Sequence, residues 1–368
     1  MNRAIIAVAG AGKTRTVVQS MLQEPDLGRT FLLTYMTRNQ LEGSTRLAKY
    51  LTSDSAFPHV MGWFSFLLNE IVRPYSRLLF EDVEVGALCT DVPDDFMYRK
   101  GTRRYFTANG DAFSERLSLL ANKVIEASGG AAIRRLEKVA SSVYIDEAQD
   151  LRGNDLDIVM RLMASKIDVT VVCDPRQSVV KTSRIDTKYK KYRDEHIVDF
   201  FNEMRSKGLC EVEWINETHR FIPEIAALSD AIFSGSGFPA TISNVEPTGY
   251  SGLYLIRKGD VERYAIKHSA TILRVDKRAG TFEGMEVANF GECKGMTRRD
   301  VVVIATAPIQ QFLSKGKPLK SEAARRFYVA VTRARQSVAI AVENPIKTLE
   351  DMAQYHSPCE QFGFCVWQ

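Results

Sequence analysis

The sequence predicts an α/β fold in which strands of parallel sheets alternate with covering helices. Short aliphatic runs alternate along the chain with stretches of helical periodicity. The chain has 368 residues, which is too long for one compact core. Hydrophobic residues make up 45% of the chain and charged residues 26%, a composition typical of folded globular proteins. Two domains are therefore expected.

The candidate strands are short runs rich in β-branched and aliphatic residues, as in strands buried on both faces. They lie at Ile5–Val8, Thr30–Thr34, Ser142–Ile145, Val169–Cys173 and Val301–Ala305. Helical periodicity is found between them, at Thr14–Gln23, Gln40–Leu51, Leu151–Ser165 and Pro223–Ser234. This alternation favours βαβ units and therefore parallel sheets.

The stretch from Met61 to Ala140 interrupts the alternation. It mixes aromatic residues with an acidic and a basic cluster, and it predicts a small, mostly helical insertion in the first domain. A Gly-, Ser- and Pro-rich stretch, Ser234–Ser251, is the expected connection between domains. The expected domains are residues 1–232, with the insertion at about 61–140, and residues 233–368.

Composition narrows the class of protein. The net charge of +4 is compatible with a nucleic-acid partner but does not require one, because local clusters matter more than the sum. The six cysteines form no CxxC pair, which favours reduced thiols over a disulfide framework or a zinc site. No apolar run approaches the roughly 20 residues of a membrane helix, and the N-terminal run is too short for a secretory signal. A cytoplasmic protein without membrane association is expected.

The run AVAGAGKT, from Ala7 to Thr14, follows the first predicted strand and opens the first predicted helix. A polyphosphate needs a loop whose backbone N–H groups point inward, and glycines permit that close approach. Lys13 would reach the β- and γ-phosphates, and Thr14 would bind Mg²⁺. This context favours a loop for a nucleoside triphosphate, with ATP and Mg²⁺ expected, over an incidental glycine-rich turn. The expected nucleotide-binding residues here are Ala9, Gly10, Ala11, Gly12, Lys13, Thr14 and Arg15.

Acidic residues follow two further strands. Asp146 and Glu147 come at the carboxyl end of the strand Ser142–Ile145, the edge at which open parallel sheets bind ligands. Asp146 would hold Mg²⁺, and Glu147 would orient and deprotonate a water molecule. Acids at the start of a helix are the competing interpretation. Asp174 and Gln177 follow the next strand and suit contacts with the γ-phosphate, while a simple Asp-Pro turn is compatible with the same residues.

Six segments, in order, resemble the motifs of the UvrD-like branch of superfamily 1 DNA helicases. They are Ala7–Thr14, Tyr144–Asp150, Cys173–Ser178, Asn216–Arg220, Glu292–Met296 and Arg326–Arg335. The resemblance implies two tandem RecA-like domains with ATP bound between them. It further implies that Arg220 and Arg333 stabilise the charge of phosphoryl transfer, as such arginines do in other phosphoryl-transfer enzymes. Lys294 and Gly295, in the fifth segment, are expected at the nucleotide.

The resemblance also implies a channel for single-stranded DNA, which needs cations for phosphates and aromatic faces for bases. Tyr35, Trp63 and Phe64 are stacking candidates, although aromatic residues at this spacing are more often core. The segment from Lys181 to Arg193 holds six positive charges and one acid, which suits either a phosphate-tracking loop or a solvated charged loop. The expected nucleic-acid contacts are Tyr35, Thr37, Arg38, Trp63, Phe64, Lys188 and Lys190.

The expected function is an ATP-dependent DNA helicase or translocase of 3′-to-5′ polarity, acting on single-stranded DNA or tailed duplex. The interval from Phe221 to Glu292 is too short for the family's large second insertion, which predicts a minimal motor, either a translocase or a partner-dependent helicase. Such a motor would suit a subunit of a repair, mobile-element or anti-phage system. The family's adenine-reading motif would lie upstream of the phosphate loop, so the expectation of ATP comes from the resemblance alone. The alternative is a nucleotide-gated DNA-binding regulatory subunit of a partner nuclease, and an RNA-directed motor remains open.

Overall fold

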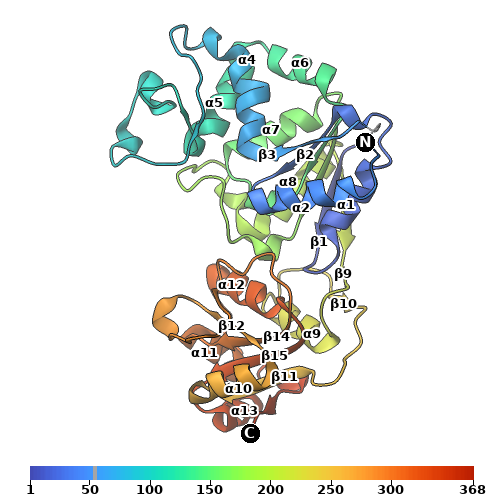
Figure 1. The fold of residues 1–368 in the computed structure, drawn as a ribbon, viewed down its shortest axis with the longest axis vertical. Helices are drawn as coiled ribbons and strands as arrows, with labels where there is room; N and C mark the ends of the chain where they lie inside the picture. Colours follow the sequence, from blue (N-terminus) through green and yellow to red (C-terminus); the bar gives the residue numbers. More distant parts are fainter. Residues whose placement is uncertain (53–55) are drawn as a thin grey trace. The chain divides into compact units, whose positions relative to one another are not determined.

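The computed structural model describes residues 1–52 and 56–368, which form two compact units. Each unit is built around its own six-stranded sheet with helices packed on it (Figure 1). The prediction of an α/β fold with two parallel sheets, consistent with tandem RecA-like domains, is confirmed. Unit 1 comprises Met1–Ile6, Lys13–Pro175 and Val180–Glu213, and unit 2 comprises Ala7–Gly12, Arg176–Val179 and Trp214–Gln368.

The sheet of unit 1 has the strand order β3-β2-β6-β7-β1-β8. Its strands are β1 (Arg3–Ala7), β2 (Thr30–Thr34), β3 (His59–Gly62), β6 (Ser142–Ile145), β7 (Asp168–Cys173) and β8 (Glu211–Ile215). The pairs β3–β2, β2–β6, β6–β7 and β7–β1 are parallel. The carboxyl ends of β6, β7 and β1 therefore lie side by side, so the segments that follow these strands are brought to one edge of the sheet.

The helices of unit 1 include the predicted insertion. They are α1 (Lys13–Met21), α2 (Thr37–Ala48), α3 (Trp63–Phe66), α4 (Arg73–Tyr75), α5 (Ser114–Ala127), α6 (Ala131–Val139), α7 (Asn154–Met163) and α8 (Ile197–Ser206). Helices α3 to α6 fall within residues 61–140, together with a π-helical segment, Leu67–Val72. The same range also holds a short parallel pair, β4 (Leu88–Cys89) with β5 (Ala112–Phe113), which the sequence pattern did not indicate.

The sheet of unit 2 has the strand order β13-β12-β14-β15-β11-β16, and all of its pairings are parallel. The strands are β11 (Gly252–Arg257), β12 (Thr271–Arg274), β13 (Val287–Asn289), β14 (Arg298–Ile304), β15 (Ala334–Val342) and β16 (Cys365–Val366). Its helices are α9 (Pro223–Ala231), α10 (Val261–His268), α11 (Ala307–Lys315), α12 (Ser321–Val331) and α13 (Pro345–Gln354).

Both faces of this second sheet are buried. Along β14, Val301 and Val303 join one hydrophobic cluster while Val302 and Ile304 join another, as the alternation of side chains along a strand requires. The first cluster takes in residues of α9, α11, α12 and α13, and the second takes in residues of α10. A continuous aliphatic run is the sequence signature of a strand buried in this way.

The long C-terminal part of unit 2 begins at Trp214. Helix α9 belongs to unit 2 because Ile225 and Leu228 are buried in the same cluster as Leu253 of β11. The Gly- and Ser-rich stretch lies within unit 2, where β10 (Ile242–Ser243) pairs with β9 (Glu217–Thr218). Among the described residues, no helix has both the length and the apolarity needed to cross a membrane.

Candidate nucleotide site

The phosphate-loop segment leaves the carboxyl end of β1 and leads into α1. Gly10 and Gly12 both have φ of +78°, a conformation that residues with a Cβ rarely adopt. A Cβ at Gly10 would also lie 2.4 Å from the Thr218 hydroxyl oxygen and 2.5 Å from Cβ of Arg220. The glycines at these positions are therefore required by the backbone path and, at Gly10, by close packing as well.

Charged and polar side chains gather where β6 and β7 of unit 1 end. The Lys13 ammonium lies 3.7 Å from a carboxylate oxygen of Asp174, which is fully buried. The Asp174 backbone N–H donates to the side-chain oxygen of Gln149 at 3.1 Å, and the Gln149 amide donates in turn to the Glu147 carboxylate. One ion pair and two hydrogen bonds thus connect the first residue of α1 to the segments that follow the two strands.

Glu147 has an unusual backbone conformation, with φ of +59°. A non-glycine residue held in this left-handed region costs about 1 to 3 kcal/mol, and such residues cluster at functional sites. Its backbone N–H donates to the Asp146 carboxylate at 2.9 Å, while the Asp146 N–H donates to the Leu33 carbonyl of β2. Two neighbouring strands therefore fix the turn that presents both carboxylates.

The charges at this edge of the sheet affect the pKa of Cys173, the last residue of β7. Burial raises the pKa of its thiol, and the Asp174 carboxylate raises it further, with smaller contributions from Glu147 and Asp146. Only Lys13 among the named charges acts in the opposite direction. The thiol is therefore neutral and unreactive, and the edge carries three carboxylates for one ammonium.

An excess of carboxylate charge fits a divalent cation. Mg²⁺ is usually held by one or two carboxylates together with substrate phosphates and water. Thr14, in the first turn of α1, and Asp146 supply a hydroxyl and a carboxylate of that kind. In the part of the chain that the structure describes, no three His, Cys, Asp or Glu side chains form a metal cluster. Arg15, the next residue on α1, is exposed.

In unit 2 the segment after β7 meets residues from two distant parts of the sequence. Arg333 is only 1% exposed, and its guanidinium donates to the side-chain oxygen of Gln177 at 3.2 Å. It also donates to the backbone carbonyls of Val329, at 2.8 Å, and Met296, at 3.3 Å. Residues of the third, fifth and sixth motif segments are thus in direct contact.

Among the other predicted residues of unit 2, Lys294 is buried, Arg220 is half-buried and Gly295 is exposed. Arg220 donates to the Thr332 carbonyl at 3.3 Å, so its guanidinium lies beside the residue that precedes Arg333. Lys294 is 5% exposed, and Gly295 follows it with φ of +84°. The fourth, fifth and sixth motif segments are therefore ordered in one unit.

Three further residues take part that the sequence pattern did not indicate. Tyr328 accepts a hydrogen bond from the Ala9 N–H at 3.2 Å, which ties the phosphate loop to α12. The Arg176 guanidinium lies 4.6 Å above the Tyr328 ring and 2.8 Å from the Asp230 carboxylate. Gln149 links the Asp174 backbone to the Glu147 carboxylate. Gln149, Arg176 and Tyr328 stand inside the motif segments, but only their tertiary contacts single them out.

The aromatic candidates for base stacking differ in exposure. Trp63 is 1% exposed, and its indole N–H donates to the buried Asp155 carboxylate at 2.7 Å, so its ring has a packing role in unit 1. Tyr35 and Phe64 are partly exposed and pack edge to face with 5.5 Å between ring centres. The Tyr35 hydroxyl donates to the Lys181 carbonyl, which connects it to the basic segment.

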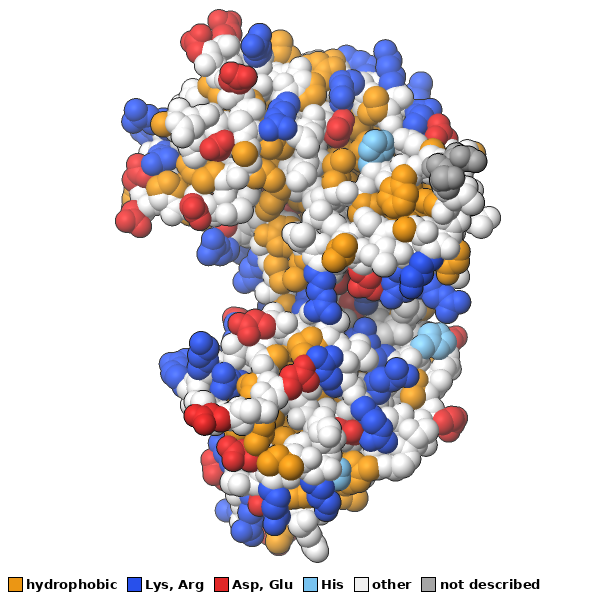
Figure 2. Space-filling model, viewed as in Figure 1, with side chains coloured by type: hydrophobic (Ala, Val, Ile, Leu, Met, Phe, Trp, Pro, Cys, Tyr) orange, Lys and Arg blue, Asp and Glu red, His pale blue; other side chains and the backbone are white. Residues whose placement is uncertain are grey.

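The polar candidates for nucleic-acid contact lie on the surface of unit 1. Thr37 and Arg38 are exposed in the first turn of α2, and Lys188 and Lys190 are exposed in the basic segment. Lys188 forms an ion pair with Asp157 of α7. On the face shown in Figure 2, Lys and Arg side chains are spread over both units among Asp and Glu side chains.

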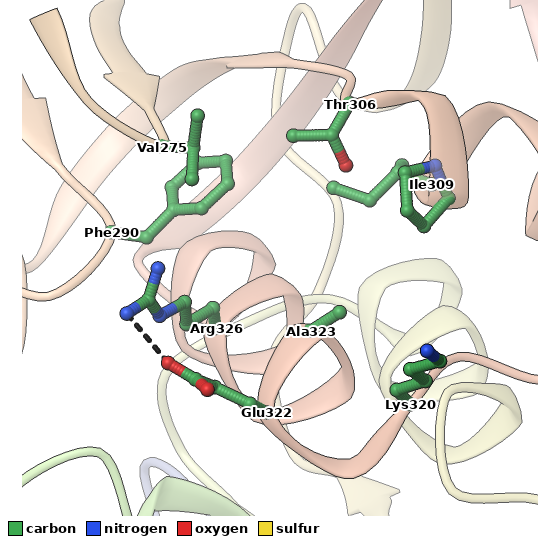
Figure 3. Close-up of a pocket in the computed structure, with 9 residues that line it drawn as sticks. Val275, Phe290, Thr306, Ile309, Lys320, Glu322, Ala323 and Arg326 are labelled. Atoms are coloured by element: carbon green, nitrogen blue, oxygen red, sulfur yellow. Dashed lines mark ion pairs between the residues drawn. The ribbon is translucent and has the colours of Figure 1, made fainter.

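Unit 2 contains a cavity of about 390 Å³ that the sequence pattern did not indicate (Figure 3). Val275, Phe290 and Thr306, which line it, follow β12, β13 and β14, so the cavity lies at the carboxyl edge of the second sheet. From α12, Arg326 also lines it and forms a 2.7 Å ion pair with Glu322. The cavity combines apolar walls with charged groups.

Comparisons with known proteins find relatives among solved structures. No protein-family model and no curated protein matches the chain. The structure of PRRSV helicase aligns with 93% of this chain and 52% of its own, at 17% identity and a TM-score of 0.46. Arterivirus nonstructural protein 10 (helicase) aligns with 93% of this chain and 59% of its own, at 14% identity and a TM-score of 0.48. The complex of Arterivirus nonstructural protein 10 (helicase) with DNA aligns with 93% of this chain and 61% of its own, at 14% identity and a TM-score of 0.48. The chain thus spans between about half and three-fifths of these proteins.

Proposed function

We propose that the chain is an ATP hydrolase that couples hydrolysis to movement along single-stranded DNA, as a compact UvrD-like helicase or translocase of superfamily 1. The observation that carries the proposal is the convergence of Lys13, Glu147 and Asp174 at one edge of the sheet of unit 1. A glycine-rich loop with two left-handed glycines precedes Lys13. Loop, ammonium and carboxylates are the parts that phosphoryl transfer requires.

The residues of unit 1 would have separate roles at the triphosphate. Lys13 neutralises phosphate oxygens, and Thr14 and Asp146 hold Mg²⁺, which supplies charge neutralisation when it is bound. Glu147 orients a water molecule and accepts its proton. The hydrogen bond from Gln149 holds the Glu147 carboxylate in place, and Gln149 also contacts Asp174, so the two acids are positioned by the same side chain.

We assign to Gln177, Arg220 and Arg333 the role of stabilising charge that develops on the γ-phosphate. Guanidinium groups in this role are typically worth about 10³ to 10⁵ in rate. Arg333 is held by two carbonyl oxygens as well as by Gln177, so its orientation is fixed before any ligand is bound. Preorganised cations of this kind lower the barrier without a reorganisation cost.

The cavity of unit 2 suits a nucleotide of the DNA strand. Phe290 offers a face for a base, since base–aromatic stacking is tolerant of sequence. Lys320, at the same cavity, offers a cation for a backbone phosphate. The exposed residues Thr37 and Arg38 of unit 1 would contact the strand as well.

ATP hydrolysis by the purified chain, alone and with single-stranded DNA, RNA or duplex DNA, tests the proposal. Strong stimulation by single-stranded DNA is expected, and strand-displacement assays on tailed duplexes then report polarity. Slow hydrolysis that no nucleic acid changes would count against a motor and in favour of a nucleotide-gated subunit of a partner such as a nuclease. Stimulation by RNA alone would overturn the assignment of DNA.

A further inference from the structure

Unit 1 also contains a cavity, of about 450 Å³, which the proposed nucleotide site does not use. Its walls come from three segments that are far apart in the sequence. Arg104 and Arg116 belong to the helical insertion, Asn154 begins α7, and Asp186 and Lys188 belong to the basic segment. The cavity therefore joins the two basic stretches of the sequence, one in the insertion and one after β7.

The two carboxylates at this cavity are already bound by other groups. Glu115 accepts hydrogen bonds from the Ser183 hydroxyl and the Arg184 N–H, both at 2.9 Å, and from the Arg184 guanidinium at 3.0 Å. Asp186 accepts from the backbone and side-chain N–H groups of Asn154, at 2.8 and 2.7 Å, and from the Lys188 N–H at 2.9 Å. Neither acid forms an ion pair with Arg104 or Arg116.

Among the described residues, no carboxylate lies within ion-pair distance of Arg104 or Arg116. The Nε atom of each is buried and has no hydrogen-bond partner. Arg116 lies over the Phe96 ring and makes only a weak 3.9 Å contact with the Met97 sulfur, and Arg104 lies 5.9 Å from the Tyr105 ring centre. Both arginines are half-buried, and buried polar atoms are normally hydrogen-bonded, so two guanidinium groups without a carboxylate partner at one cavity favour an anion there.

Like charges also oppose each other here. Burial lowers the pKa of Arg116, and the nearby positive charge of Arg104 lowers it further, while Tyr105, Asp186 and Glu115 act in the opposite direction with smaller effects. An anion between the two guanidinium groups would replace this repulsion with attraction. Phosphate oxygens suit it, because a planar guanidinium can present two N–H groups to one phosphate.

The wall formed by the basic segment is held in place. Thr182 donates to the backbone carbonyl of Asp150 and to the buried Asp155 carboxylate, and Arg193 donates to the Asp186 carbonyl. A Cβ at Gly153, whose φ is +49°, would lie 2.1 Å from the Asp186 carboxyl carbon. The segment is therefore anchored against α7, and the cavity exists without a ligand to order it.

We propose that this cavity binds a backbone phosphate of single-stranded nucleic acid through Arg104 and Arg116. The inference rests on the proposed function for the identity of the polymer. The segment Lys181–Arg193 carries further exposed cations, Lys181 and Lys190, while Arg184 pairs with Glu115 and Lys191 with Glu203. Several cations in one segment favour a polymer over one free phosphate, because successive phosphates can each meet a cation.

The test compares the wild-type chain with the double variant Arg104→Gln/Arg116→Gln in oligothymidylate binding, followed by fluorescence anisotropy over a range of salt. The salt slope is the slope of the logarithm of the binding constant against the logarithm of the salt concentration. Each phosphate contact contributes about 0.7 to it for single strands, so loss of this one contact should lower the slope by about 0.7. The variant Arg104→Lys/Arg116→Lys keeps the charge and should retain most of the slope. Arg134→Ala removes an exposed cation of α6 that does not line the cavity, and it should change neither affinity nor slope.

The outcomes separate this inference from the proposed function. The double variant should have the circular dichroism spectrum of the wild type. If it then binds the oligonucleotide more weakly and with a smaller salt slope, the result supports phosphate binding at the cavity. An unchanged slope overturns it, and so does binding of inorganic phosphate that the double variant abolishes while oligonucleotide binding stays intact. Hydrolysis of ATP without nucleic acid should be equal in both proteins. If neither protein hydrolyses ATP but the slopes still differ, the proposed function fails and the phosphate site stands.

Discussion

The ammonium of Lys13 and the carboxylate of Asp174 lie 3.7 Å apart, with the Asp174 side chain fully buried and that of Lys13 12% exposed. A buried charge needs a partner, because the loss of hydration is otherwise uncompensated. Asp174 thus holds the end of the Lys13 side chain at the edge where β7 terminates. The pair links the structural integrity of unit 1 to the residue that we propose binds phosphate.

Replacing Lys13 by Ala should therefore remove both activity and stability. Turnover should fall to background because the phosphate contact is lost. The free energy of unfolding should fall by about 3 kcal/mol, the usual cost of leaving one member of a buried pair unpaired. Steady-state hydrolysis and urea denaturation measure the two effects. Lys166→Ala, an exposed lysine, is the control and should change neither. Measurable turnover in Lys13→Ala would refute the assignment of the phosphate loop.

Glu147→Gln should separate binding from chemistry. The amide keeps the size of the side chain but cannot accept a proton from water, so turnover should fall by about 10² to 10⁴. Affinity for the triphosphate should remain within a few-fold, since Lys13 and the glycine loop are unchanged. Nucleotide binding by calorimetry and single-turnover hydrolysis give the two quantities. A variant with normal turnover would show that another group accepts the proton.

Arg333→Lys tests whether the geometry of the guanidinium matters beyond its charge. Lysine cannot contact Gln177, Val329 and Met296 at once, because it lacks the planar fork. Turnover should fall by about 10³ or more. Thermal unfolding should also shift downward, because two carbonyl acceptors lose a donor. Arg335→Lys, at an exposed position two residues on, is the matched control. A lysine variant as active as wild type would reduce Arg333 to a structural residue.

The local sequence pattern was sufficient to predict the strands, but it was insufficient to predict the contacts between distant segments. The strands Thr30–Thr34 and Ser142–Ile145 have the bounds that their aliphatic runs predicted, because burial on both faces leaves an unbroken apolar signal. The expected domain boundary was drawn from the flexible composition of residues 234–251, which gives no indication of where the apolar face of α9 packs. That face is recognisable only once Ile225 and Leu228 are seen in the second core.

The candidate site shows the same division. The order of the motif segments was sufficient to select Lys13, Glu147 and Arg333 as candidates, and their roles are proposals. The bridge through Gln149 and the anchor of Ala9 on Tyr328 join residues 25 or more positions apart, so no local pattern encodes them. The two cavities also arise from segments that meet only in the folded chain.

Trp63→Phe distinguishes a base-stacking role for this residue from a packing role. Asp155 accepts hydrogen bonds from the Trp63 indole, from the Ser118 and Thr182 hydroxyls and from the Arg152 N–H. Removing the indole donor should lower the free energy of unfolding by about 1.5 to 3 kcal/mol, as for hydrogen bonds to charged groups. Affinity for single-stranded DNA should stay the same, because the ring is buried. A stable variant that binds DNA several-fold more weakly would instead support stacking.

The ion pair of Glu286 with Arg298 should make the stability of unit 2 depend on pH in the acid range. The Arg298 guanidinium donates to both carboxylate oxygens and Thr271 donates to one of them, which lowers the pKa of Glu286 from its ordinary 4.5 to about 2. The folded state therefore binds this proton less tightly than the unfolded state does. The stabilisation is complete above pH 4.5 and is lost as the pH falls through about 2.

Glu286→Gln should remove this part of the pH dependence. Its free energy of unfolding should fall below that of wild type at neutral pH, and the two curves should converge between pH 4.5 and pH 2. Urea denaturation of both proteins across this range gives the difference directly, since contributions from other carboxylates cancel. Glu262→Gln, on the exposed side of α10, should leave a curve parallel to wild type. Curves of Glu286→Gln and wild type that stay parallel down to pH 2 would show that the pair is equally formed in the unfolded chain, because only a difference in proton affinity between the two states produces a slope.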